Sequence, residues 1–149
     1  MPSQFEDDLR HALEEARAAH EGLLAVLAPL TDADLDRARR GGWSVRQVLE
    51  HLILAEKGYL RVLALLQESP EPPPRPEPAP VASLAQAVRE LEAGRCALLE
   101  ALREVDEELF YTLRPVGREE FSVLTLLENL ASHEREHTAQ IKAILEATS

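Results

Sequence analysis

The chain has 149 residues, which suits one domain with a single buried core, and its formal net charge at pH 7 is −11. This acidic balance argues against nucleic acid and anionic membranes as partners, because both are bound through cationic side chains. Aromatic residues make up only 4% of the chain, which favours helices over sheets. The single Cys96, the absence of a signal pattern and the absence of a membrane-spanning apolar run predict a cytoplasmic protein.

The first predicted helix begins at Ser3. Ser3 and Glu6 have the spacing of a capping box, in which each side chain accepts a hydrogen bond from the other's backbone amide. Behind them an apolar stripe recurs every three or four positions through Phe5, Leu9, Leu13, Ala16, His20, Leu23 and Leu27. Pro29 and the polar stretch 31–42 end this helix, with a short helical turn expected from Asp32 to Ala38.

Three further helices are predicted from the same signals. Ser44 with Gln47, Ser83 with Gln86, and Ser122 mark their starts. The stripe of the third helix continues through Val105 to Leu109. Four starts followed by four apolar stripes predict an all-α fold.

The segment 69–82 between the second and third helices holds seven of the ten prolines. Such a segment favours polyproline II at about 3.1 Å per residue, so it can reach roughly 40 Å. The second helix should be about 35 Å long, so this crossover can return the chain along it. The prediction is therefore one domain, 1–149, forming a four-helix bundle in the order up-down-down-up. A loop without this role, or a proline-rich ligand for a partner domain, are the alternatives.

His133 and His137 lie on the inner face of the last helix, one turn apart, so both imidazoles leave the same face. Together with Glu134 they fit the H-E-x-x-H pattern, in which two histidines bind zinc and the Glu is a general base. A zinc peptidase is disfavoured, because little chain follows His137 and no strands are expected to form a substrate-binding edge.

A third ligand must come from earlier in the chain, and His51 on the second helix is the best candidate. Three neutral imidazoles with open coordination positions could bind zinc, nickel, cobalt or iron. The alternative is three unrelated helical histidines.

The order of these residues resembles the DinB/YfiT-like superfamily of metalloenzymes: Trp43-Ser44, then His51, with His133 and His137 closing the chain. The resemblance covers essentially the whole chain. It implies the four-helix bundle, a metal ion on the three histidines, and frequent homodimers. It also implies an activity, because some relatives transfer low-molecular-weight thiols such as bacillithiol or mycothiol, or isomerise substrates with a thiol's help.

Other polar and aromatic residues receive weaker assignments. His20 could approach the metal, but a core or boundary position is favoured. Glu134 could orient a ligand or accept a proton, or it could be a surface carboxylate. Cys96 is expected to be a packing residue, and Trp43 is expected to plug the end of the core. Nothing in the sequence places the Tyr59 hydroxyl near a pocket.

Two functional hypotheses follow. The first is an enzyme that acts on a small molecule, whose metal ion activates a thiol for S-transfer in detoxification or stress response, or activates water for hydrolysis. The family resemblance alone favours the thiol over water. The second is a non-catalytic bundle whose ion has a structural or interaction role. Three strong ligands without an obvious fourth favour the enzyme, because structural sites usually complete their coordination with protein atoms.

Overall fold

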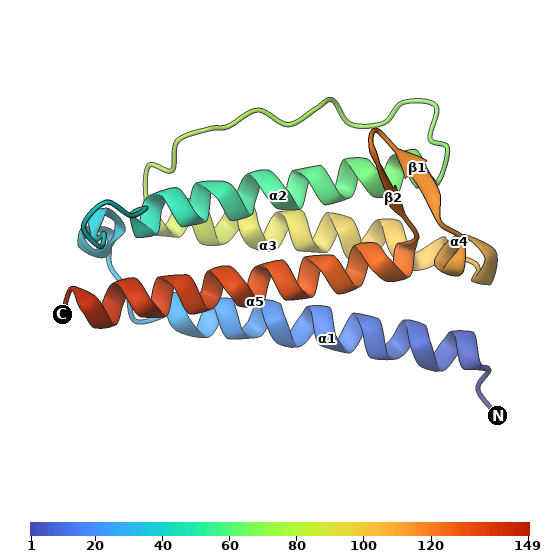
Figure 1. Cartoon of the computed structure of the whole chain (residues 1–149), viewed down its shortest axis with the longest axis horizontal. Helices are drawn as coiled ribbons and strands as arrows, with labels where there is room; N and C mark the ends of the chain where they lie inside the picture. The colour runs from blue at the N-terminus through green and yellow to red at the C-terminus, as the bar shows by residue number, and fades with distance from the viewer.

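A computed structural model describes all residues, 1–149, and four long helices dominate it (Figure 1). α1 and α5 run in one direction, and α2 and α3 run in the other. The predicted up-down-down-up bundle is therefore confirmed. None of the helices combines the length and apolar character that crossing a membrane requires. The four helices are α1 (Gln4–Leu27), α2 (Val45–Leu66), α3 (Leu84–Ala101) and α5 (Val123–Ala147).

The helices begin where the capping signals predict. Reciprocal capping boxes are present at Ser3, Ser44 and Ser122. At the start of α3 only half of the predicted box forms. The Ser83 hydroxyl accepts from the Gln86 amide at 3.1 Å, but the Gln86 side chain accepts from the Ala82 amide instead.

The proline-rich connection passes along the outside of α2 and returns the chain to the start of α3, as predicted (Figure 1). Its far end is anchored: Val81 is buried, and its amide donates to the Glu50 carboxylate at 2.8 Å. The guanidinium groups of Arg46 and Arg61 donate to backbone carbonyls of the connection. A short 3₁₀ helix, η1 (Asp32–Asp36), lies between α1 and α2.

The chain between α3 and α5 differs from the prediction. The expected helical stripe through Leu109 is wrong, because Val105 is extended and Asp106 caps a new helix through the Leu109 amide. The expectation that no strands form is also wrong, since a two-stranded hairpin turns at Gly117, whose φ is 64°. The elements here are η2 (Leu102–Glu104), α4 (Glu107–Tyr111), β1 (Arg114–Val116) and β2 (Glu119–Phe121).

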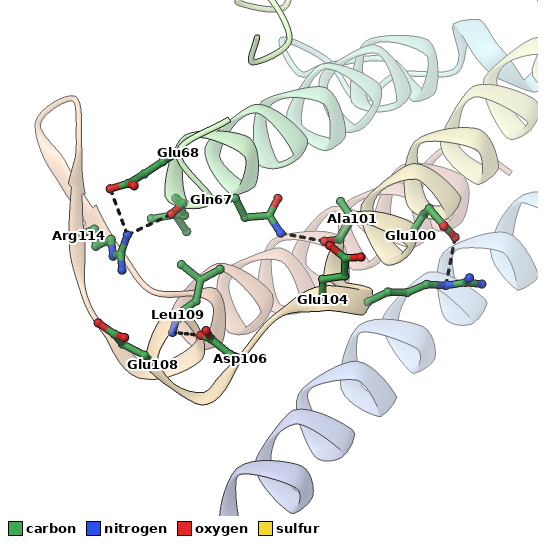
Figure 2. Close-up of a pocket in the computed structure, with 11 residues that line it drawn as sticks. Gln67, Glu68, Glu100, Ala101, Glu104, Asp106, Glu108, Leu109 and Arg114 are labelled. Carbon is green, nitrogen blue, oxygen red and sulfur yellow. Dashed lines mark hydrogen bonds and ion pairs between the residues drawn. The ribbon is translucent and has the colours of Figure 1, made fainter. Parts of the chain in front are cut away.

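An acidic hollow of about 700 Å³ lies where this hairpin meets the ends of α2 and α3 (Figure 2). Arg114 lies 3.6 Å from the Glu68 carboxylate, and the Gln67 amide donates to the Ala101 carbonyl at 2.9 Å. These contacts attach the hairpin to α2, and α2 to α3. No histidine lines the hollow.

The apolar core is divided in two by a buried polar layer. One cluster packs around Leu23, Leu49 and Ile141, and the other packs around Leu63, Leu98 and Leu126. Between them along the helices lie the buried side chains of Glu56, Arg95, Glu134 and Thr138.

Arg95 of α3 links all four long helices within this layer. Its Nε lies 2.8 Å from Glu56 Oε1 on α2, and its Nη2 lies 3.0 Å from Glu134 Oε1 on α5. Its Nη1 donates to the Ala16 carbonyl of α1 at 2.9 Å. His20 Nδ1, also on α1, lies 3.2 Å from Glu134 Oε2. No buried side-chain polar atom is left without a hydrogen-bond partner.

We expect Arg95→Met to lower the free energy of unfolding by about 3–5 kcal/mol, because it leaves two buried carboxylates without their cation. Arg103→Met is the matched control, since Arg103 pairs with Glu100 on the exposed surface. That variant should change stability by about 0.5 kcal/mol or less. Urea unfolding followed by circular dichroism measures both, and equal losses in the two variants would contradict a central role for Arg95.

Alanine substitutions at Gly94 and Gly58 should change the free energy of unfolding in opposite directions. A Cβ at Gly94 would lie 2.7 Å from Cγ of Glu56, which Arg95 holds in place. We expect Gly94→Ala to cost about 1–3 kcal/mol through overpacking. A Cβ at Gly58 meets nothing within 4 Å, so Gly58→Ala should stabilise α2 by about 0.5–1 kcal/mol. Thermal melts of both variants test the steric argument, which fails if the two shifts have the same sign.

Candidate metal centre

Three histidines from two helices meet at the partly exposed boundary between α2 and α5. His51 Nε2 lies 2.9 Å from His133 Nε2, and His137 Nε2 lies 3.1 Å from the same atom. One nitrogen from each ring falls within 4.8 Å of the other two. The structure thus brings together the three residues selected from the sequence.

The environment of His51 and His133 favours the neutral imidazole form, and the ring nitrogens of all three histidines face one another. His137 Nδ1 lies 2.7 Å from the Oε1 atom of Gln140, so the tautomer with its proton on Nδ1 would donate to Gln140 and leave Nε2 as the metal-binding nitrogen. Burial lowers the pKa of His51 and of His133, and repulsion from His137 lowers both further. Neutral nitrogens are the form in which histidine binds metal ions.

This donor set fits a transition-metal ion. A tetrahedral ion with metal–nitrogen distances of about 2.05 Å holds its ligand nitrogens roughly 3.3 Å apart, close to the two spacings above. No cysteine or carboxylate joins the cluster. Three imidazoles are the protein ligands of one class of catalytic zinc site, which leaves a further position open. The same nitrogens are compatible with nickel, cobalt and iron.

Two aromatic side chains flank the cluster. The Trp43 ring is parallel to His137 within 8°, at a centroid distance of 6.4 Å, and lies 5.3 Å from the His51 ring. The Tyr59 ring lies 6.3 Å from His133, and its hydroxyl donates to Asn129. Burial is the main reason that the pKa of Tyr59 rises to about 12, so the hydroxyl stays protonated at neutral pH.

The expectation that Trp43 plugs the core is wrong. The residue is 44% exposed, because it precedes the first turn of α2 in a surface loop and lies beside the histidines. Tyr59 lies about two helical turns beyond His51, and it reaches the site by its contact with His133 of α5, which the sequence alone does not indicate.

Glu134 occupies a different position from the histidines. The sequence predicts a general base or a ligand-orienting residue at this position, but the two carboxylate oxygens of Glu134 face Arg95 and His20 in the buried layer. His20 belongs to that layer and lies outside the histidine cluster. Cys96 is exposed, so its expected packing role is wrong.

Arg95 and Glu56 were missed by the sequence analysis. The available signal was a charged residue on an apolar stripe, since Arg95 falls between Leu91 and Leu98 at helical spacing. A charge at such a position is buried and must be paired.

Comparison with known proteins identifies the family. The family model of the DinB superfamily matches residues 12–141. The chain belongs to the DinB superfamily. Among the relatives of this DinB chain, a proposed metal-dependent hydrolase of Bacillus licheniformis is 33% identical, over 93% of this chain and 85% of that protein. A proposed metal-dependent hydrolase of Geobacillus thermodenitrificans is 28% identical, over 96% of this chain and 88% of that protein.

Solved structures share the four-helix-bundle fold of this DinB chain. The four-helix bundle protein TT2238 superposes with a TM-score of 0.70 at 28% identity, covering 90% of this chain and 98% of that one. A DinB-like protein from Bacillus cereus superposes with a TM-score of 0.74 at 18% identity, covering 91% of this chain and 89% of that one. The second likeness shows the shared fold.

Gln140 should decide the tautomer of His137. Long-range ¹H–¹⁵N spectra of metal-free protein should show His137 protonated at Nδ1, because an N–H there can donate a hydrogen bond to the side-chain oxygen of Gln140. Gln140→Leu removes the acceptor, and we expect the other tautomer to become populated. Gln4→Leu, which alters an exposed amide of α1, should leave the His137 signals unchanged. Identical tautomer populations in the two variants would show that Gln140 does not orient the ring.

Proposed function

We propose that His51, His133 and His137 bind one divalent transition-metal ion and that the protein is a metal-dependent enzyme acting on a small molecule. The convergence of three imidazole nitrogens without a fourth protein ligand supports this proposal. A structural ion would usually be enclosed by four protein ligands. The partial exposure of all three histidines also leaves room for a substrate beside the ion.

The chain's own residues prepare the site. The ion, when bound, supplies a Lewis acid that lowers the pKa of a water molecule or a thiol. Gln140 helps to orient the His137 ring through its contact with Nδ1, which leaves Nε2 facing the other histidines. The aromatic rings of Trp43 and Tyr59 lie beside the histidines on two sides of the site. Glu134 helps to hold α5 against α3 through Arg95, and this pairing makes it a poorer candidate for the general base.

Hydrolysis is the favoured reaction. Two relatives that match most of this chain carry the name of metal-dependent hydrolases. Thiol-dependent S-transfer in detoxification or stress response, which the family resemblance implies, is the second candidate. Its support is chemical, since an open position on a three-histidine ion accepts a thiolate as readily as water.

Elemental analysis of protein purified without a histidine tag and without chelators tests the metal site. We expect about one equivalent of a transition metal, as one set of three imidazoles implies, and its loss in His137→Ala. His11→Ala is the matched control and should retain the ion, because His11 is an exposed histidine outside the cluster. If no metal binds even after Zn²⁺ or Ni²⁺ is added at neutral pH, the proposal is wrong.

The same variants separate an enzyme from a structural metal protein. Loaded protein is screened with ester and amide substrates, and with electrophiles in the presence of low-molecular-weight thiols. An enzyme predicts that His137→Ala loses activity while its melting temperature stays near that of His11→Ala. A structural ion predicts a large fall in the melting temperature of His137→Ala and no turnover in any screen.

A further inference from the structure

A hollow of about 400 Å³ lies beside the candidate metal centre, between the loop that precedes α2 and the last turns of α5. The loop 39–43 contributes Arg39, Arg40 and Trp43, and α5 contributes Gln140 and Ile144. This volume accommodates part of a small molecule.

The hollow adjoins the histidine cluster. Gln140 and Ile144 extend the face of α5 that carries His133 and His137, because the four positions follow the three- and four-residue steps of one helix face. Two lining residues also touch the cluster directly. Trp43 lies parallel to His137, and the Gln140 side chain is hydrogen bonded to the same ring. A molecule in the hollow therefore lies next to the candidate metal centre.

Two arginines without an ion pair are among the residues that line this hollow. Neither Arg39 nor Arg40 forms an ion pair, whereas eight other arginines of this acidic chain pair with carboxylates. The acidic residues nearest in sequence are already engaged, Asp34 by Arg37 and Asp36 by Arg46. Both guanidinium groups are therefore available to an external anion.

The loop is held in a defined shape. The Gly42 amide donates to the Arg39 carbonyl at 2.9 Å, and Gly41 has a φ of 75°, which glycine adopts without strain. A bridge between Ala38 and Ser44 closes the loop at its base. The two arginines and Trp43 are thus presented from one short turn.

We propose that this hollow binds the acidic group of the substrate, a carboxylate or a phosphate, on Arg39 and Arg40. Guanidinium groups bind both anions through paired, charge-assisted hydrogen bonds. The Trp43 ring packs against the adjoining apolar part of the substrate, whose reactive group then faces the histidines. The assignment of this anion as part of a substrate rests on the proposed metal-dependent activity, whereas the binding of the anion does not.

Fluorescence provides the test, because Trp43 is the only tryptophan in the chain and lines the hollow. Metal-free protein is titrated with benzoate, phenyl phosphate and benzamide, which share a ring and differ in the head group. We expect at least one acid to quench Trp43 saturably, with a Kd about 10-fold or more below that of neutral benzamide. The tighter of the two acids identifies the preferred anion.

The double variant Arg39→Gln/Arg40→Gln should raise the Kd of that acid by about 10-fold or more. Arg89→Gln/Arg118→Gln is the matched control, because these arginines also lack ion pairs and lie outside the hollow, and it should bind like the unsubstituted protein. The inference is overturned if neither acid binds more tightly than benzamide, or if the Arg39→Gln/Arg40→Gln variant keeps the original Kd. Elemental analysis tests metal binding independently of this titration. Acid binding through the arginines in a protein that never takes up metal would therefore refute the proposed activity and leave the anion site standing.

Discussion

The buried guanidinium of Arg95 is the contact on which the relative positions of the helices depend. Apolar packing above and below it is non-directional and would tolerate small shifts of one helix along another. The bonds from Arg95 to Glu56 and Glu134 have fixed lengths and directions, so they set the register of α2 and α5 against α3. Because Glu134 follows His133 directly, and Glu56 lies five residues after His51, the same register brings the histidine rings together.

The string from His133 to His137 shows how one sequence pattern can serve two layers of a bundle. The two histidines lie one turn apart at the partly exposed α2–α5 boundary. Glu134 is rotated by about 100° from His133, toward the centre of the bundle. Its side chain is only 6% exposed and is satisfied by Arg95 and His20. The glutamate that acts as a base in zinc peptidases thus belongs here to the layer that supports the site.

Much of the fold was predictable because its signals are local. Serine caps, apolar stripes and the proline-rich crossover each depend on residues close in sequence, and so does the pairing of His133 with His137. The end of α3 escaped prediction because apolar residues at Leu102, Val105 and Leu109 continue the helical period past Ala101. Arg95 and its carboxylates escaped because each partner lies 39 residues away, on another helix. The side-chain direction of Trp43 depends on how its loop joins α2, which no periodicity encodes.

The placement of charge bears on how an acidic protein could bind an acidic ligand. Screening at physiological ionic strength limits the reach of surface charges to about 8 Å, so the net charge of −11 exerts little force inside a particular hollow. The charged groups within about 8 Å determine which ligands the hollow binds. In the hollow at the end of α5 these groups include the unpaired Arg39 and Arg40. Most other arginines are neutralised by carboxylates, and Arg95 is buried among them. Free positive charge beside the histidines can therefore select an anion locally.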